Sequence, residues 1–417
     1  MPDTLLRRDT MMHVGDPLTP GVPAIVSAER MDPAFAGLPP IPSQPISFRD
    51  ATMLLRLLRL RVNNVFNLAL VNNVIATMRG SVEPDRYVVV GAQRDSFGHG
   101  ALRPAPSTAS LLALGQALGK LKELGSAEPP KHPAVQLGSG RVRPGGIHRV
   151  GRGASVRATV TSHRLPGHKR VLLRPETMDA MSDNVPFSHY AGVPSMSFRF
   201  LPHEGDGSGS SPSDPTYPAY HTAYDTLLLY NNWTNHHLTP LCARLHGAAL
   251  WLASDSPLLP VNFSALANCL EDSLEELRSG PTALELELNG VSLNPLRLAI
   301  ERFRKAADNW TLYLETLNHS RPELLRELND RAMLAEQALL KTTGLPGRPL
   351  TRHLLWSPSE FDRRKVTGFP VLADLLFYIS QLPPDTRDQG WKNVRFYLAD
   401  VLVALRSAAA ALLVPAS

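Results

Sequence analysis

The sequence has few cysteines and lacks a long apolar run. Cys242 and Cys269 are its only cysteines, so at most one disulfide can form, and their spacing matches no zinc-binding motif. No stretch reaches the roughly 18 to 20 consecutive apolar residues that a membrane-spanning helix needs. The N-terminal residues also lack the apolar core of a signal peptide. We therefore expect neither a disulfide scaffold, nor a membrane anchor, nor a signal peptide within this chain.

Acidic residues are missing from one segment. Residues 129–174 contain ten Lys or Arg residues and no Asp or Glu, in a chain whose net charge is only +5. The rest of the chain is therefore net negative, and it gives no indication of nucleic acid binding. The segment is rich in Gly and Pro and has neither helical nor strand periodicity. We expect residues 129–176 to form a disordered basic segment.

The sequence also lacks the short motifs of several enzyme classes. It contains no G-x-S-x-G motif, no phosphate-binding loop and no Cys-His arrangement suited to nucleophilic catalysis. Its 43% hydrophobic and 19% charged residues are normal for a globular protein, and 417 residues leave room for two or three domains.

The first half of the chain has the pattern of an α/β domain. Residues 1–60 hold repeated Pro and Gly turn signals and predict an extended connection. Residues 71–77 and 87–90 are rich in β-forming side chains and predict buried strands. Residues 107–124 begin with Ser/Thr capping candidates and place four leucines on one helical face. This order favours an α/β sheet, to which residues 193–201 would add a strand.

The last third of the chain has helical periodicity instead. Two stripes of apolar side chains recur at steps of three and four, as on one face of a helix, and a third helix is expected over residues 321–340. Core packing of a helical bundle is the simplest interpretation, and contact with a partner subunit is the alternative. The stripes consist of Leu296, Ile300, Phe303, Ala307, Trp310, Leu314 and Leu317, and of Val394, Leu398, Val401, Leu405, Ala408 and Leu412.

Four N-x-S/T sequons lie within 90 residues of one another, at Asn232, Asn262, Asn309 and Asn318. Such sequons are acceptors for N-linked glycans in secreted proteins. One or two would be expected by chance, but four favour an extracellular ancestry. This expectation conflicts with the missing signal and anchor, and a truncated chain would resolve the conflict.

Several phrases resemble the transferrin receptor and glutamate carboxypeptidase II family. In family order they read GDPLTPGVP, GLPPIPSQPIS, RGSVEPDRYVVVGAQRDSFGHGA, YPAYHTAYDT, LNDRAMLAEQALL and RHLLWSP. The resemblance implies a single-pass type II plasma membrane protein with an extracellular ectodomain. It further implies three parts: a remnant of the preceding domain over residues 1–60, an incomplete zinc-peptidase-like α/β domain over 61–257, and a helical dimerisation domain over 258–417.

The basic segment is explained if it is translated out of frame. Read one base later, the codons of residues 129–150 permit RRSILLFSWEAGEYGxVGSTEW, which resembles the family's strand and helix after its first strand–helix unit. We infer a frameshift, a mis-spliced isoform or a faulty gene model over residues 129–173, with some fifty family residues missing before the frame returns near Met178. A natural disordered insert is the alternative, and the transcript sequence would decide between them.

Peptidases of this family hold two zinc ions with two His, a bridging Asp and further carboxylates, and a Glu serves as general base. Carried over by motif, the first His position is Gln93, whose neutral amide is a poor zinc ligand. The bridging Asp position is Arg103, whose permanent positive charge repels metal ions.

The remaining ligand positions are also depleted. The general base and its neighbouring ligand fall near Gly140 and Arg141, and the next Asp falls near Gly167. His221 is the one surviving ligand, and alone it is more simply a hydrogen-bonded histidine in a turn. Asp95 is more simply a structural carboxylate than a catalytic acid. We therefore expect no metal, no cofactor and no catalytic residue.

The resemblance thus favours a non-enzymatic, transferrin-receptor-like protein with a role in uptake or sensing of an iron carrier. Its expected partners are a transferrin-like protein, which stays in doubt because residues 300–305 contain no Arg-Gly-Asp, and a second copy bound through the helical domain. Two alternatives stay open. One is a zinc-dependent glutamate carboxypeptidase or acidic dipeptidase, and the other is a non-functional truncated isoform.

Overall fold

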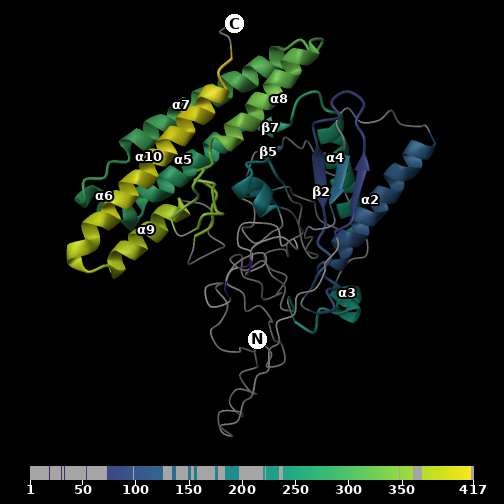
Figure 1. The fold of residues 1–417 in the computed structure, drawn as a ribbon, viewed down its shortest axis with the longest axis horizontal. Helices are drawn as coiled ribbons and strands as arrows, with labels where there is room; N and C mark the ends of the chain where they lie inside the picture. The colour runs from purple at the N-terminus through teal and green to yellow at the C-terminus, as the bar shows by residue number, and fades with distance from the viewer. Residues whose placement is uncertain are drawn as a thin grey trace. The chain divides into compact units, whose positions relative to one another are not determined.

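The computed structural model describes a mostly helical chain with a few short strands (Figure 1). The described residues divide into two compact units: residues 1–147 with 198–255, and residues 148–197 with 256–417. No helix among them is long and apolar enough to cross a membrane. The described residues are Leu18, Arg30, Asp32 and Met53, together with 73–96, 98–124, 134–137, 149–151, 155–156, 174–176, 184–196, 219–220, 222–233, 238–346, 348–359 and 369–414.

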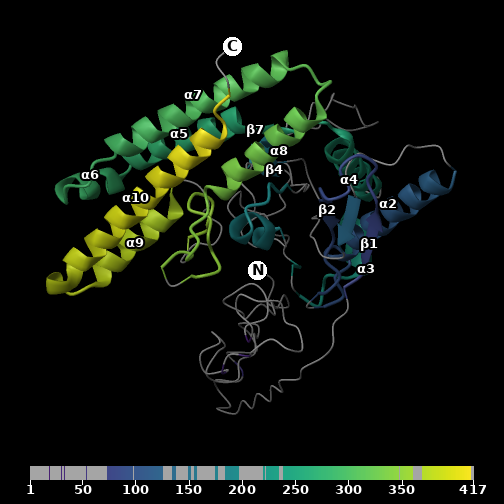
Figure 2. The same cartoon turned by 45° about the horizontal axis from the view of Figure 1, so that its top comes forward.

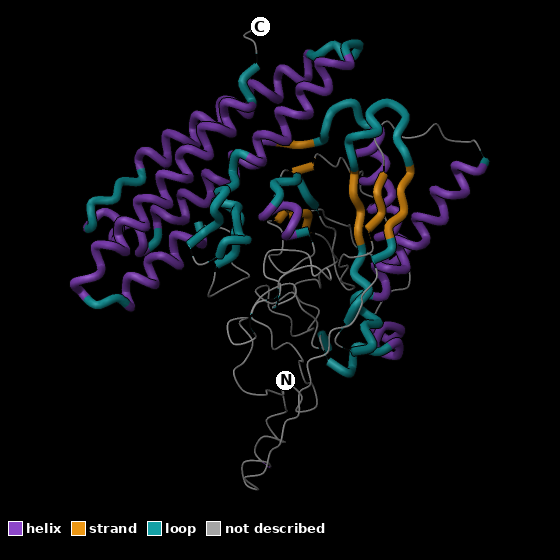
Figure 3. The backbone as a smooth tube through the Cα atoms, viewed as in Figure 1, coloured by secondary structure: helices purple, strands orange, loops and turns teal. Residues whose placement is uncertain are grey.

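The first unit contains a small sheet of three strands, which lie side by side in Figure 3. Strand β3 (Ala134–Leu137) lies between β1 (Ile75–Met78) and β2 (Val88–Gly91). It runs antiparallel to β1, with Ile75 opposite Leu137, and parallel to β2, with Val88 opposite Ala134. The strands predicted at residues 71–77 and 87–90 are therefore present, each within a few residues of its predicted bounds.

The sequence predicted that these two strands are buried, and this prediction is wrong. Ile75 is 59% exposed and Val89 is 43% exposed, and β2 alternates between half-buried and exposed residues. Helix α4 (Leu238–Asp255) packs against β2, so one set of side chains is covered while the alternate set faces outward. A run of consecutive β-formers predicts burial on both faces, but only one face of this sheet has a packed layer among the described residues.

Helix α2 (Ala105–Glu123) follows the sheet and packs against α4. Its leucines at 111, 114 and 118 are half-buried, which confirms the predicted stripe, although Leu121 is 37% exposed. Helix α3 (Leu227–Trp233) completes the described helices of this unit. The first unit therefore has strands and helices in the predicted order.

The basic segment contains more strand than its sequence indicates. Besides β3, the structure describes β4 (Arg149–Gly151), β5 (Ser155–Val156) and β6 (Arg174–Glu176). Strand β4 pairs in parallel with β6, and β5 pairs antiparallel with β7 (Val261–Asn262). Pairing with distant strands can order short runs that have no periodicity of their own. The rest of residues 129–176 lies outside the described residues.

The strand predicted at residues 193–201 is absent over its described part, Val193 to Met196. It is preceded by one turn of π-helix, η1 (Pro186–Tyr190), where Val193 N donates to Phe187 O at 2.8 Å. This local hydrogen bond replaces a strand ladder, so the β-forming side chains here do not produce a strand.

The second unit is a bundle of long helices (Figure 2). Helix α7 packs against α5 and α10, and α10 also packs against α8 and α9. The helices are α5 (Phe263–Ser279), α6 (Pro281–Leu288), α7 (Asn294–Thr316), α8 (Pro322–Gln337), α9 (Pro370–Gln381) and α10 (Arg387–Ala411), with a 3₁₀ turn η2 (Pro384–Thr386) before α10.

The core of the bundle is built from the two predicted stripes. The five residues from Leu296 to Trp310 on α7 are all buried, while Leu314 and Leu317 are partly buried against the same core. All six residues of the α10 stripe, from Val394 to Leu412, are buried. The helical bundle expected from the sequence is therefore confirmed, because one apolar face per helix is enough to assemble a core.

Candidate functional site

The two substituted metal-ligand positions lie in one small pocket of the first unit. The loop after β2 and the start of α2 supply Gln93 and Arg103, and the turn before α3 supplies Thr222 and Asp225. The pocket is lined by Gln93, Asp95, Ser96, Gly98, Gly100, Arg103, Thr222 and Asp225. The structure thus brings together the residues that the sequence placed at the first His and the bridging Asp.

Arg103 is a buried cation within this lining. The residue is 5% exposed, and its guanidinium carbon lies 4.8 Å from the centre of the Tyr220 ring. This distance is within the range of a favourable cation–π interaction. The aromatic face therefore helps to keep a full positive charge in the pocket.

Asp225 fixes the backbone beside Arg103. Its carboxylate Oδ1 accepts a hydrogen bond from the backbone N–H of Leu102 at 2.6 Å, and its carbonyl accepts one from Ala101 at 3.1 Å. Asp225 is 3% exposed, and buried carboxylates of this kind are held by hydrogen bonds. The sequence prediction missed Asp225, although it lies four residues after His221 in the same YPAYHTAYDT phrase.

The other polar residues of the pocket have structural contacts. The backbone carbonyl of Gln93 accepts a hydrogen bond from the Thr108 hydroxyl at 2.6 Å, which ties the loop to α2. The Ser96 hydroxyl donates to the Gly98 carbonyl and closes the turn that follows Asp95. Asp95 itself is exposed. Ser96 rather than Asp95 therefore makes the hydrogen bond expected in this turn.

The described lining does not suit a pair of zinc ions. It offers the carboxylates of Asp95 and Asp225, but the Arg103 guanidinium lies in the same pocket and repels divalent cations. Across the described part of the chain, no three His, Cys, Asp or Glu side chains are grouped so that they could hold a metal ion. Gly140, Arg141, Gly167 and His221 lie outside the described residues.

The sequon asparagines differ in their surroundings. Asn232, Asn309 and Asn318 are exposed. Asn262 is half-buried and caps α5, because its side-chain oxygen accepts a hydrogen bond from Ala265 N at 3.0 Å. Asn262 therefore has a structural role that is independent of any glycan.

Comparisons with known proteins match a named domain within the helical part of the chain. Residues 291–413 match the transferrin receptor-like dimerisation domain. The chain is 29% identical to aminopeptidase NAALADL1 of Rattus norvegicus over 497 residues, covering 96% of this chain and 65% of that protein. It is 28% identical to the probable glutamate carboxypeptidase AMP1 of Arabidopsis thaliana over 452 residues, covering 89% of this chain and 62% of that protein.

The chain thus spans less than two thirds of the length of these relatives. Both alignments are longer than the 417 residues of the chain itself, so gaps must fall within this chain. Such gaps agree with family residues missing from its interior. The chain is therefore similar to an aminopeptidase and to probable glutamate carboxypeptidases, and its residues 291–413 match the transferrin receptor-like dimerisation domain.

Proposed function

We propose that this chain is a non-catalytic relative of the aminopeptidase and glutamate carboxypeptidase branch, and that it pairs with a second copy through its helical unit. The relatives named above are peptidases, which supports the peptidase branch, the alternative left open from the sequence. Uptake of an iron carrier, the first expectation from the sequence, has no support in the comparisons beyond the dimerisation domain.

The observation that carries the non-catalytic proposal is the position of Arg103. A guanidinium keeps its charge at any physiological pH, so Arg103 cannot become neutral by losing a proton. A binuclear site would place two divalent cations within a few ångströms of that charge, with Gln93 in place of a histidine. Both substitutions precede residues 129–173, the segment inferred to be out of frame. They would therefore persist if the reading frame of that segment were restored.

The test is the zinc content and peptidase activity of the purified full-length chain. Elemental analysis should find well below one zinc per chain, and neither an aminoacyl-nitroanilide nor an acidic dipeptide should be cleaved above background. The rat aminopeptidase, purified and assayed in the same way, is the positive control. About two zinc per chain, or zinc-dependent cleavage of either substrate, would show that the proposal is wrong.

Pairing through the helical unit rests on the match of residues 291–413 to a dimerisation domain. Helix α10 also carries exposed apolar side chains opposite its buried face, with Phe396 64% exposed and Val403 62% exposed. These two residues are seven apart and share one face of the helix. Sedimentation velocity of the full chain should find a dimer. Phe396→Ser should shift the equilibrium toward the monomer. A monomeric wild type would refute the pairing.

The non-functional isoform remains a second candidate because of the exposed strands of the first unit. Open strand faces such as those of Ile75 and Val89 promote association between chains. Size-exclusion chromatography separates the two possibilities. A stable dimer supports the pairing proposal, whereas aggregates that form across all concentrations support the non-functional isoform.

A further inference from the structure

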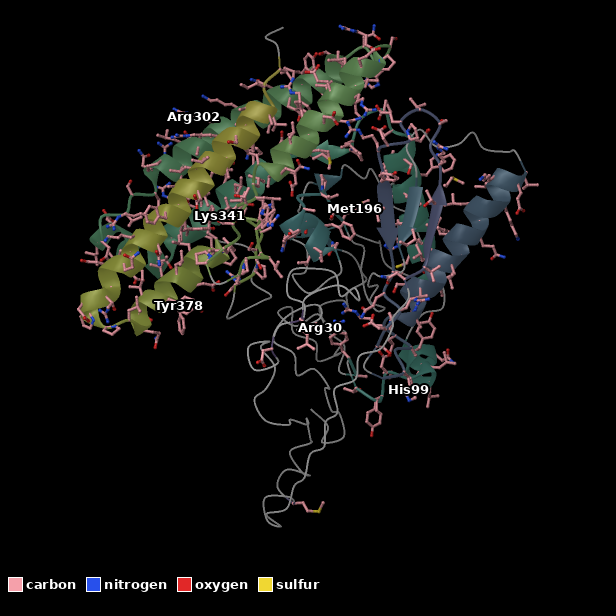
Figure 4. The ribbon with its side chains drawn as sticks, viewed as in Figure 1. Arg30, His99, Met196, Arg302, Lys341 and Tyr378 are labelled. Atoms are coloured by element: carbon pink, nitrogen blue, oxygen red, sulfur yellow. The ribbon has the colours of Figure 1, made fainter. Side chains whose placement is uncertain are left out.

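The segment of residues 184–196 packs on the end of α8 and on the α8–α9 connection, within the second unit. The backbone N–H of Arg352 donates to the His189 carbonyl at 3.0 Å. The Arg352 guanidinium lies 3.8 Å from the centre of the Tyr190 ring and donates to its hydroxyl at 3.0 Å. Figure 4 labels Met196 at the end of this segment and Lys341 at the start of the connection.

Close approach of the backbone completes this contact. Gly192 has a φ of 64°, and a Cβ atom there would lie 2.9 Å from Leu340 Cδ1 and 3.0 Å from Gln337 Cα. Any side chain would therefore push the segment away from α8. Residues 184–196 rest directly on the bundle, and we call them the latch segment.

A pair of buried imidazoles lies where the latch segment packs on the connection, one from each side. His189 is 4% exposed and His353 is 0% exposed, and their ring centres are 6.0 Å apart. His189 Nδ1 has no hydrogen bond partner among the described residues. An imidazolium at either position would be a buried charge facing a second imidazole, which is unfavourable.

The His353 ring is held in place by the turn that it closes. Its Nδ1 accepts hydrogen bonds from Leu355 N at 3.2 Å and Trp356 N at 3.1 Å. Because Nδ1 accepts, the ring N–H is on Nε2, which lies 3.4 Å from the buried Glu336 Oε1. Glu336 from α8 therefore contacts His353.

Among the described residues, the charged and titratable groups near His189 are His353 and Arg352 of the connection, Tyr190 of its own turn, and Glu336, which contacts His353. None of the described carboxylates is hydrogen-bonded to the unpartnered Nδ1 of His189. Burial and the neighbouring His353 lower the pKa of His189 to about 3. His189 therefore stays neutral when the segment is attached.

We propose that the latch segment is an acid-sensitive latch. Its attachment to the bundle is in equilibrium with a detached state, and at acidic pH protonation of His189 in the detached state shifts this equilibrium away from attachment. When the segment detaches, His189 enters water and regains its ordinary affinity for protons. Because only the detached state then binds the proton, the detached fraction rises about tenfold for each pH unit below about 6.5. Between pH 7.5 and pH 5.0 the expected increase is about 30-fold.

Hydrogen exchange of the full chain, read by mass spectrometry and divided by the intrinsic exchange rate at each pH, tests the latch. Peptides covering 184–196 and 348–359 should lose protection about 30-fold between pH 7.5 and pH 5.0, while peptides of α7 should not. His189→Gln, which cannot be protonated in this range, should abolish the pH dependence. His319→Gln removes an exposed histidine and should leave it unchanged.

Arg352→Ala gives an independent measure, because it removes the contacts to Tyr190 and leaves both imidazoles in place. It should increase exchange at both pH values and keep the 30-fold ratio between them. If His189→Gln does not fold, as circular dichroism would reveal, this ratio in the wild type and in Arg352→Ala decides. A ratio near one in the wild type, or an undiminished ratio in folded His189→Gln, would overturn the latch.

Discussion

The two units differ in how their cores are assembled. In the second unit, helices α5, α7, α8, α9 and α10 contribute to one continuous core that includes Phe303 and Val401. In the described part of the first unit, the clustered buried apolar residues are Leu102, Ala219 and Tyr220, with two partly buried neighbours. The strands beside that cluster keep apolar side chains exposed.

The difference follows from where each unit obtains its hydrogen bonds and its apolar partners. A helix satisfies its backbone within itself, and an apolar stripe then needs only another stripe. A strand needs a neighbour that is distant in sequence, and here the central strand β3 comes from the basic segment. A change confined to residues 129–176 therefore affects the sheet far more than the bundle.

Cutting the chain before the helical bundle should produce the largest effect. A fragment of residues 256–417 should be helical by circular dichroism and should melt cooperatively, because its core is internal. A fragment of residues 1–255 should show no cooperative transition, because few apolar groups are clustered in its described part. The comparison fails if the first fragment has no helical signal or if the second melts as sharply as the full chain.

Trp310→Ala should destabilise the second unit by about 3 to 5 kcal/mol in urea denaturation. The side chain is 2% exposed and packs edge-to-face with Phe263 at 6.3 Å between ring centres. Leu312→Ala, two positions along α7 and 62% exposed, is the matched control and should change stability by less than about 0.5 kcal/mol. Equal effects of the two substitutions would contradict the assigned core.

Asp374→Asn should destabilise the same unit by about 3 kcal/mol, because it leaves the largely buried guanidinium of Arg348, 15% exposed, without its carboxylate. Asp374 accepts from Arg348 Nη2 at 3.2 Å and from the Ser359 hydroxyl at 2.6 Å, and its side chain is 5% exposed. Asp400→Asn breaks the more exposed ion pair with Lys341 and should lower stability by less than about 1 kcal/mol. Urea denaturation of both variants checks the difference.

Apart from the control substitutions, Asn262→Ala should have the smallest effect, about 1 kcal/mol, because it removes the cap of α5. Asn309→Ala is the control, since it also removes a sequon but lies exposed within α7. In protein made without glycosylation, the control should be neutral or slightly stabilising. A neutral Asn262→Ala in thermal unfolding would show that the cap contributes little.

Sequence prediction succeeded where the signal is local. The stripes from Leu296 and from Val394 specify one buried face each, and both are buried in the bundle. It was wrong about the burial of β1 and β2, because burial depends on which layers cover a sheet. It also predicted a strand over residues 193–201, where the described part follows a π-helical turn instead.

The candidate site divides in the same way. Motif positions placed Gln93 and Arg103 at substituted ligand positions, and the structure places both in one pocket. Asp225 was missed because its role is a hydrogen bond to Leu102, which is 123 residues away in the sequence. Periodicity and motif spacing contain no information about such a pair.

The sequence by itself determined the helices of the bundle, the identity of the residues at the ligand positions and the absence of acidic residues from the basic segment. These properties depend on spacing and on chemical type, which are both local. Only the tertiary structure decided that Arg103 is buried beside Tyr220, and that His189 of the latch segment meets His353. Burial and pairing arise from contacts between residues distant in sequence, and those contacts set the cost of each charge.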